Sequence, residues 1–158
     1  MKLFLSIALI FLFVSPKIYG QEIELNSEAD VKLYLMNEKV EKGSSVQHTA
    51  DEVSLNTGDF VSVQVYRNTD APYPDYSYGL LFRLSPAGTD KLDNLSKKNP
   101  GQYLVLRSHG HTFNSNRLGN KFSGQWLLWN ASLRKLIAEK WLNHITGKKL
   151  LPDPFREK

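Results

Sequence analysis

The chain has 158 residues, and 41% of them are hydrophobic. It has a formal net charge of +4 at pH 7 and contains no cysteine. This length fits one domain with a single core, and the lack of cysteine excludes a disulfide framework and thiolate chemistry. The positive and negative charges are too evenly balanced to favour nucleic-acid binding, which requires a concentrated basic surface.

Residues 1–20 are predicted to be a secretory signal peptide. Lys2 supplies a positive start, and an apolar run follows over Leu3–Val14. This run has the length of a signal-peptide core and is shorter than the roughly 20 residues that span a bilayer. An uncleaved N-terminal anchor is the alternative. Cleavage would leave one domain, residues 21–158, with a net charge of +2 because two lysines are lost. We therefore expect a periplasmic or secreted protein without a transmembrane segment in its mature chain.

Alternating apolar residues predict several strands in the first half of this domain. The runs that show the alternation are 21–26, 31–36, 52–56, 60–66 and 76–84. The clearest of them places Val61, Val63 and Val65 on one face. The polar stretch 37–51 is predicted to be a long surface loop, either a binding loop or an ordinary connector. The proline-rich stretch 67–75 would let its two flanking strands pair antiparallel.

A helix is predicted to follow directly on the last of these strands. Ser85 can cap it with its hydroxyl, and Pro86 fits the first helical position, where a backbone N–H is not needed. Pro100 stops this helix. The extended run 103–107 then begins a hairpin that turns at residues 108–110, where a glycine is present.

The last part of the chain is predicted to contain two strands and a second helix. The stretch 111–118 is polar and rich in asparagine, which is typical of a weak strand or one at a sheet edge. The stretch 121–129 is extended and apolar at its end. Asn130 is expected to cap a helix that begins at Ala131, because apolar residues then recur at three- and four-residue steps, and Gly147 is placed to end it.

Aromatic residues supply the candidate binding residues. Tyr73, Tyr76 and Tyr78 either form a contact patch at the loop before their strand or cover an edge of the core. Trp126 and Trp129 either line an apolar groove for a peptide or belong to the core.

His109 and His111 are the one pair with the spacing of metal ligands. Two imidazoles two residues apart can share a strand face, but a zinc site requires three or four ligands, and His48 and His144 could join them only through the fold. We expect no metal, no cofactor and no catalytic residue, and a glycine turn flanked by exposed histidines. The scattered carboxylates and the lack of a Gly-x-Ser-x-Gly motif give no indication of a hydrolase.

Four stretches, in this order along the chain, carry a resemblance to a known family. They are Phe82–Leu92 (FRLSPAGTDKL), Asn99–Arg107 (NPGQYLVLR), Phe122–Gly124 (FSG) and Gly147–Pro154 (GKKLLPDP). Together they resemble the head of the first periplasmic domain of SecD, a subunit of the bacterial protein-export complex SecDF. The resemblance extends from about residue 31 and is strongest over 77–154. It departs from the family at His109, where the family usually has aspartate before the turn glycine.

The resemblance implies a head that contacts emerging polypeptide. In the family this head is thought to move by proton flow through the membrane part, and no hydrophobic span follows Pro154 here, so only the capacity to contact a polypeptide or an envelope partner is expected. The predicted fold is α+β, a mostly antiparallel sheet of about five or six strands with two helices packed on one face. The predicted protein is an exported, non-enzymatic binding module. The alternative is a small secreted metal-dependent enzyme or hydrolase that uses His109 and His111.

Overall fold

The structure is a computed structural model and describes residues 20–36 and 52–152. The predicted signal peptide, apart from its last residue, and the predicted loop at 37–51 lie outside the described residues. Within these ranges the helices and strands follow one another as β1 (Ile23–Glu24), β2 (Lys32–Leu35), β3 (Val53–Leu55), the 3-10 helix η1 (Thr57–Asp59), β4 (Phe60–Arg67), the 3-10 helix η2 (Pro74–Tyr76), β5 (Tyr78–Leu84), α1 (Pro86–Lys98), β6 (Tyr103–Ser108), β7 (His111–Arg117), β8 (Trp126–Leu133) and α2 (Lys135–Ile145).

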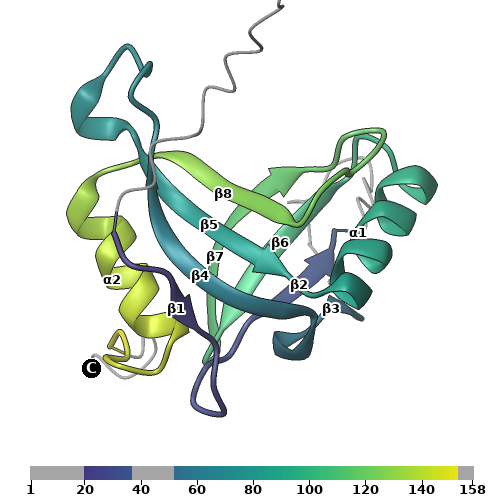
Figure 1. Cartoon of the computed structure of the whole chain (residues 1–158), viewed down its shortest axis with the longest axis horizontal. Coiled ribbons are helices and arrows are strands. Elements are labelled where there is room, and N and C mark those ends of the chain that lie inside the picture. The colour runs from purple at the N-terminus through teal and green to yellow at the C-terminus, as the bar shows by residue number, and fades with distance from the viewer. Residues whose placement is uncertain (1–19, 37–51, 153–158) are drawn as a thin grey trace, which may run out of the picture.

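The strands form two antiparallel sheets that cross each other (Figure 1). The first sheet has the order β1-β4-β5-β8 and the second has the order β3-β2-β6-β7. The predicted α+β class with antiparallel strands and two helices is confirmed. The strands, however, divide between two sheets of four, where one sheet of five or six was expected.

A capped corner at η1 lies where the chain passes from the second sheet to the first. The Asn56 side chain accepts a hydrogen bond from the Gly58 N–H at 3.0 Å, and the Asp59 carboxylate accepts one from the Asn56 N–H at 2.9 Å. This reciprocal pair is a capping box, which fixes the direction in which the chain enters a helical turn. β3, in the second sheet, precedes this turn, and β4, in the first sheet, follows it directly.

β4 and β5 pair antiparallel from Phe60 opposite Leu84 to Arg67 opposite Tyr78, as the sequence predicts. The sequence predicted that the valines form one buried face of β4. The structure buries both faces of the strand over Ser62–Val65. The predicted edge position of the polar strand is confirmed, since β7 is the last strand of the second sheet.

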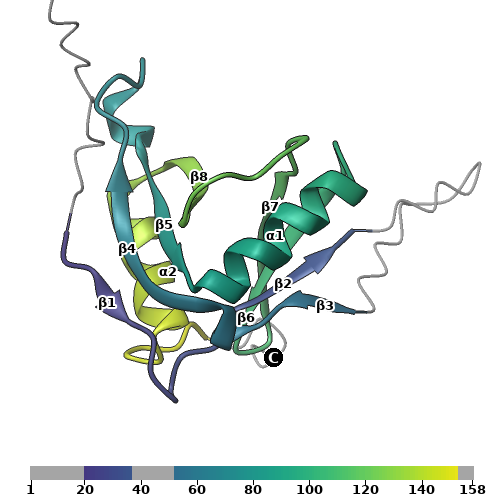
Figure 2. The same ribbon diagram turned by 45° about the vertical axis from the view of Figure 1, so that its right-hand side comes forward.

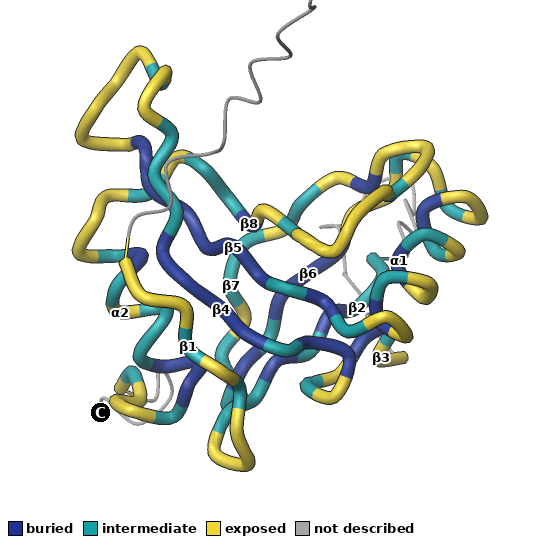
Figure 3. Tube along the Cα trace, in the orientation of Figure 1, coloured by how far each residue is buried: buried dark blue, intermediate teal, exposed yellow. Residues whose placement is uncertain are grey.

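Both helices contact β5, but their other contacts differ. α2 packs against β4 and β5, whereas α1 packs against β3, η1 and β5, and the two helices stand apart on either side of the crossing strands (Figures 1 and 2). One apolar core joins both sheets and both helices, as the buried segments at the centre of Figure 3 show. No helix among the described residues is long and apolar enough to span a membrane.

The two helix starts differ in how well the sequence predicts them. The Ser85 hydroxyl accepts a hydrogen bond from the Gly88 N–H at 3.1 Å, which confirms it as the cap of α1. The prediction that Asn130 caps the last helix is wrong, because β8 continues to Leu133 and α2 begins at Lys135.

The conformation of Asn130 explains this error. Its φ is +51°, and its side-chain oxygen accepts a hydrogen bond from the Ser132 N–H at 2.9 Å. This local bond is the one that a helix cap would use, but here it forms at an irregularity in β8, between Trp129 and Leu133, which both pair with β5.

Candidate binding surfaces

The segment between β4 and β5, residues 68–77, carries the most exposed tyrosine side chains of the described chain. We call it the tyrosine loop. Tyr73 is 72% exposed and Tyr76 is 45% exposed. The loop projects from the body of the molecule (Figure 3) and is closed at its base by a hydrogen bond of 2.7 Å from the Asn68 N–H to the Ser77 carbonyl. The Ser77 hydroxyl also donates to the Pro74 carbonyl at 2.7 Å.

Tyr78 differs from the two tyrosines that precede it. It is the first residue of β5 and is buried. The three tyrosines of the sequence prediction therefore divide into an exposed pair and a third that covers the core.

The start of α2 extends the surface of the tyrosine loop. The Arg134 guanidinium lies 4.9 Å from the centre of the Tyr76 ring and also donates a hydrogen bond to the Tyr76 hydroxyl. Leu136, two residues further on, is 60% exposed. We call Tyr73, Tyr76, Arg134 and Leu136 the tyrosine surface. Beside it lies a pocket of about 580 Å³, whose lining residues are Arg67, Pro74, Asp75, Tyr78, Arg134, Lys135 and Leu136.

The two candidate tryptophans lie on opposite faces of β8, because they are three residues apart in a strand. Trp126 is 36% exposed, and Leu128 on the same face is 39% exposed. Trp129 is fully buried, and its indole N–H donates to the Asn114 side chain at 2.8 Å. Trp129 is thus a core residue, and Trp126 alone of the pair is available at a surface.

The edge strand β7 lies beside β8 without backbone pairing to it. Two side chains of β7 bridge the gap. Asn114 accepts from Trp129, and the Asn116 amide donates to the Leu128 carbonyl at 3.0 Å. These bonds hold the edges of the two sheets together where no ladder of main-chain hydrogen bonds forms.

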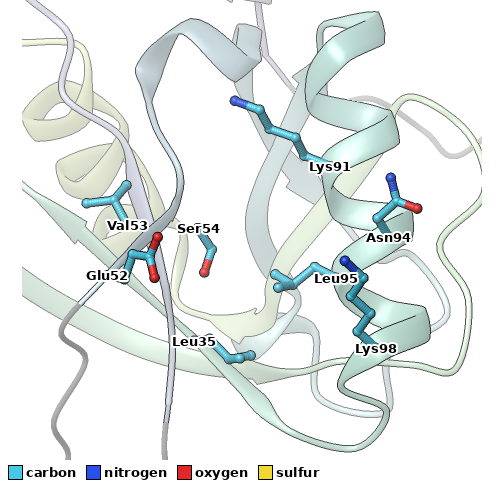
Figure 4. A pocket seen from close by; sticks show the side chains of 8 residues that line it. All are labelled: Leu35, Glu52, Val53, Ser54, Lys91, Asn94, Leu95 and Lys98. Atoms are coloured by element: carbon cyan, nitrogen blue, oxygen red, sulfur yellow. The ribbon is translucent and has the colours of Figure 1, made fainter.

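A second pocket, of about 410 Å³, lies between α1 and the second sheet (Figure 4). Its lining residues are Leu35, Glu52, Val53, Ser54, Lys91, Asn94, Leu95 and Lys98. Lys91 is already paired with Asp59 at 2.7 Å. No motif in the sequence predicts this pocket. The local indication of this pocket in the sequence is that Leu92 and Leu95, three residues apart, form a narrow apolar stripe and leave most of the surface of α1 polar.

The fold brings a third histidine to the predicted histidine pair. The ring of His144, on α2, lies 5.2 Å from that of His109 and 4.6 Å from that of His111, measured between ring centres. His144 is fully buried. Its Nε2 lies 2.9 Å from the Ser108 carbonyl and its Nδ1 accepts from the Leu151 N–H at 2.8 Å, so the ring is neutral with its proton on Nε2.

His109, His111 and His144 form a cluster whose ring hydrogen bonds go to the protein backbone. Burial lowers the pKa of His144, and the nearby His109 and His111 rings lower it further. Both nitrogens of His144 are already engaged, and Nε2 of His111 lies 2.8 Å from the Pro152 carbonyl. Among residues 20–36 and 52–152, no three histidine, aspartate or glutamate side chains are placed to hold a metal ion.

Comparison with known proteins shows which folds this chain resembles. No family model matches the chain, and no curated protein matches it. Solved structures do match it, among them two of SecDF. The first, described as a membrane component SecDF that enhances protein export, has a TM-score of 0.58 and 11% identity, over 80% of this chain and 65% of the other. The second, SecDF in a super-membrane-facing form, has a TM-score of 0.59 and 11% identity, over 80% of this chain and 20% of the other.

The chain has a SecD-like fold. It spans less than two thirds of the first SecDF chain and one fifth of the second. The most specific stretch of the sequence resemblance, Phe82–Leu92, forms the end of β5 and the first half of α1. Its glycine, Gly88, is required by close packing, because a Cβ atom there would lie 2.0 Å from the Asp59 carbonyl oxygen. The SecD-like junction thus seats α1 directly on the η1 corner.

Proposed function

We propose that this protein is an extracytoplasmic, non-enzymatic module of protein export that binds polypeptide through its tyrosine surface. The observation that supports the proposal is the exposed pair Tyr73 and Tyr76 on the tyrosine loop of a SecD-like fold. Tyr76 contacts Arg134, which lines one pocket with the exposed Leu136. Exposed aromatic and aliphatic side chains that lie together are typical of interaction sites.

The geometry of the tyrosine surface favours binding at low entropic cost. Tyrosine has few side-chain torsions to immobilise, and the Tyr76 ring is already held by Arg134 through stacking and a hydrogen bond. The loop backbone is closed by the bond between Asn68 and Ser77. A preorganised aromatic group of this kind is the usual centre of a binding hot spot.

The proposed context and location are supported by the fold. One structure with this fold is described as a membrane component that enhances protein export, and a predicted signal peptide would direct the chain across the membrane. An unfolded, exported chain is the partner that such a location supplies. The edge of β7 is already joined to β8 through Asn114 and Asn116, so the proposal assigns binding to the tyrosine surface.

The test is binding of a permanently unfolded, fluorescently labelled secretory protein to the purified protein. We expect binding to the unfolded form in preference to the folded form. The double variant Tyr73→Ala with Tyr76→Ala should weaken it about tenfold or more, since hot-spot tyrosines contribute roughly 1–2 kcal/mol each. Tyr103→Ala is the matched control, because Tyr103 is 38% exposed but lies on β6.

Two results would contradict the proposal. Equal loss in the double variant and in Tyr103→Ala would contradict a site at the tyrosine loop. Equal binding of folded and unfolded forms would contradict recognition of an unfolded chain.

A further inference from the structure

The pocket beside the tyrosine surface is lined by more cations than carboxylates. Arg67, Arg134 and Lys135 line it, and Asp75 is its one acidic residue. Lys135 pairs with Glu139 at 3.6 Å. Within the described part of the chain, neither arginine forms an ion pair with an acidic residue. Among the described residues, the two arginines therefore carry positive charge that no ion pair neutralises, although Asp75 lies in the same pocket.

Arg67 has an unused hydrogen-bond donor. Its Nε is enclosed and has no hydrogen-bond partner among the residues that the structure describes. Its guanidinium lies 5.5 Å from the centre of the Tyr78 ring. The Nε is closed to solvent, so a ligand in the pocket would meet Arg67 through the other guanidinium N–H groups.

Arg134 complements Arg67 from α2. It is exposed and is held over the Tyr76 ring. Stacking of a guanidinium on an aromatic face fixes its plane and leaves the N–H groups at its edge available. The two arginines thus present oriented donors to one pocket from two different elements.

We propose that the tyrosine surface selects polypeptide segments in which a carboxylate lies next to an apolar side chain. The carboxylate binds at Arg67 and Arg134, and the apolar side chain packs on Leu136, which lines the same pocket. Planar guanidinium groups bind carboxylates through paired, charge-assisted hydrogen bonds. This inference rests on the proposed function, because it names the class of polypeptide that the same surface binds.

The carboxylate has two possible sources, an aspartate or glutamate side chain and a free C-terminus. An anionic lipid surface is a different class of partner. It is less favoured because a membrane is bound by many cations spread over a surface, whereas here the arginines converge on one pocket beside apolar side chains.

The experiment measures fluorescence anisotropy of three labelled peptides in a flexible Gly/Ser host sequence at low salt. The first contains Leu-Asp with an amidated C-terminus, and the second contains Leu-Asn with the same amidated end. The third ends in Leu with a free carboxylate. We expect one or both carboxylate peptides to bind about tenfold more tightly than the Leu-Asn peptide. That preference should disappear in Arg134→Gln and in Arg67→Gln.

Lys140→Gln is the matched control. Lys140 is an exposed cation on α2 that does not line the pocket, so its loss changes net charge equally and should leave the preference intact. Arg134 is exposed and its variant is expected to fold, which keeps the test valid if Arg67→Gln unfolds. Circular dichroism of each variant checks this.

The outcomes separate this inference from the proposed function. Equal binding of all three peptides, with loss in the tyrosine double variant, would overturn carboxylate selection and leave polypeptide binding intact. No binding of any peptide would overturn both. An equal effect of Lys140→Gln and Arg134→Gln would reduce the preference to net charge and overturn the site. Binding to anionic lipid vesicles that depends on Arg134, without a peptide preference, would overturn it in favour of a lipid partner.

Discussion

His144 couples stability to pH through a buried ring that must stay neutral. It is enclosed by Ser108, His109 and His111, with Asp30 nearby. Burial lowers its pKa below the ordinary value of 6.5, so between those two values the unfolded chain binds a proton that the folded protein does not. The contribution of His144 to stability is therefore complete above about pH 6.5 and is lost as the pH falls below that value.

We expect the urea midpoint of the protein to fall between pH 7.5 and pH 5.5, roughly over the range in which an unfolded histidine titrates. His144→Gln should be less stable at pH 7.5, because the amide fills the site less well, but its midpoint should change less with pH. The measurement is urea unfolding at a series of pH values. An equally steep change in both proteins would assign the titration to another group.

Asp30 acts in a separate, more acidic range. Its partial burial opposes ionisation, but hydrogen bonds from Lys32 and from the His109 N–H outweigh that effect and lower its pKa below 3.8. The contribution of Asp30 is present above pH 3.8 and is lost as the pH falls through the lowered value. The two residues therefore affect stability at different pH.

At the scale of elements, α1 depends on a single side chain at its start. The Ser85 hydroxyl accepts from the Gly88 N–H and donates to the Asp59 carbonyl at 3.2 Å. We expect Ser85→Ala to lower the free energy of unfolding by about 1 kcal/mol, as the loss of a helix cap does, and Ser85→Thr to restore most of it. Urea unfolding measures both. Ser123→Ala, at an exposed position, is the control, and an equal loss there would contradict the capping role.

At the scale of the whole molecule, the two sheets meet at β7 and β8 through side chains. Asn114→Ala would leave the buried Trp129 N–H without an acceptor, and we expect a loss of about 1–3 kcal/mol in the free energy of unfolding. Asn116→Ala removes a bond in an exposed position, where water can replace the amide, and should cost no more than about 0.5 kcal/mol. Urea unfolding of the two variants distinguishes them, and equal losses would mean that the sheet contact does not depend on the buried bond.

Signals that act within a few residues could be interpreted from the sequence. Ser85 with Pro86 predicted the start of α1, and the pair His109 and Gly110 predicted a tight hairpin turn, where φ is +45° and +79°. Gly147, with φ +76°, follows the last helix as expected. Each depends on a backbone preference or a hydrogen bond between near neighbours, which the local sequence alone determines.

The tertiary structure decided what depends on distant partners. Asn130 has the chemistry of a helix cap, yet pairing of β8 with β5 keeps it in a strand. Tyr76 and Tyr78 are two residues apart, and one is exposed while the other is buried. Arg67 and Arg134 meet at one pocket although 66 residues separate them in sequence. Which side chains are buried, and which meet at one pocket, depends on how distant segments pack together. That packing is a property of the whole chain, so a short sequence pattern cannot predict it.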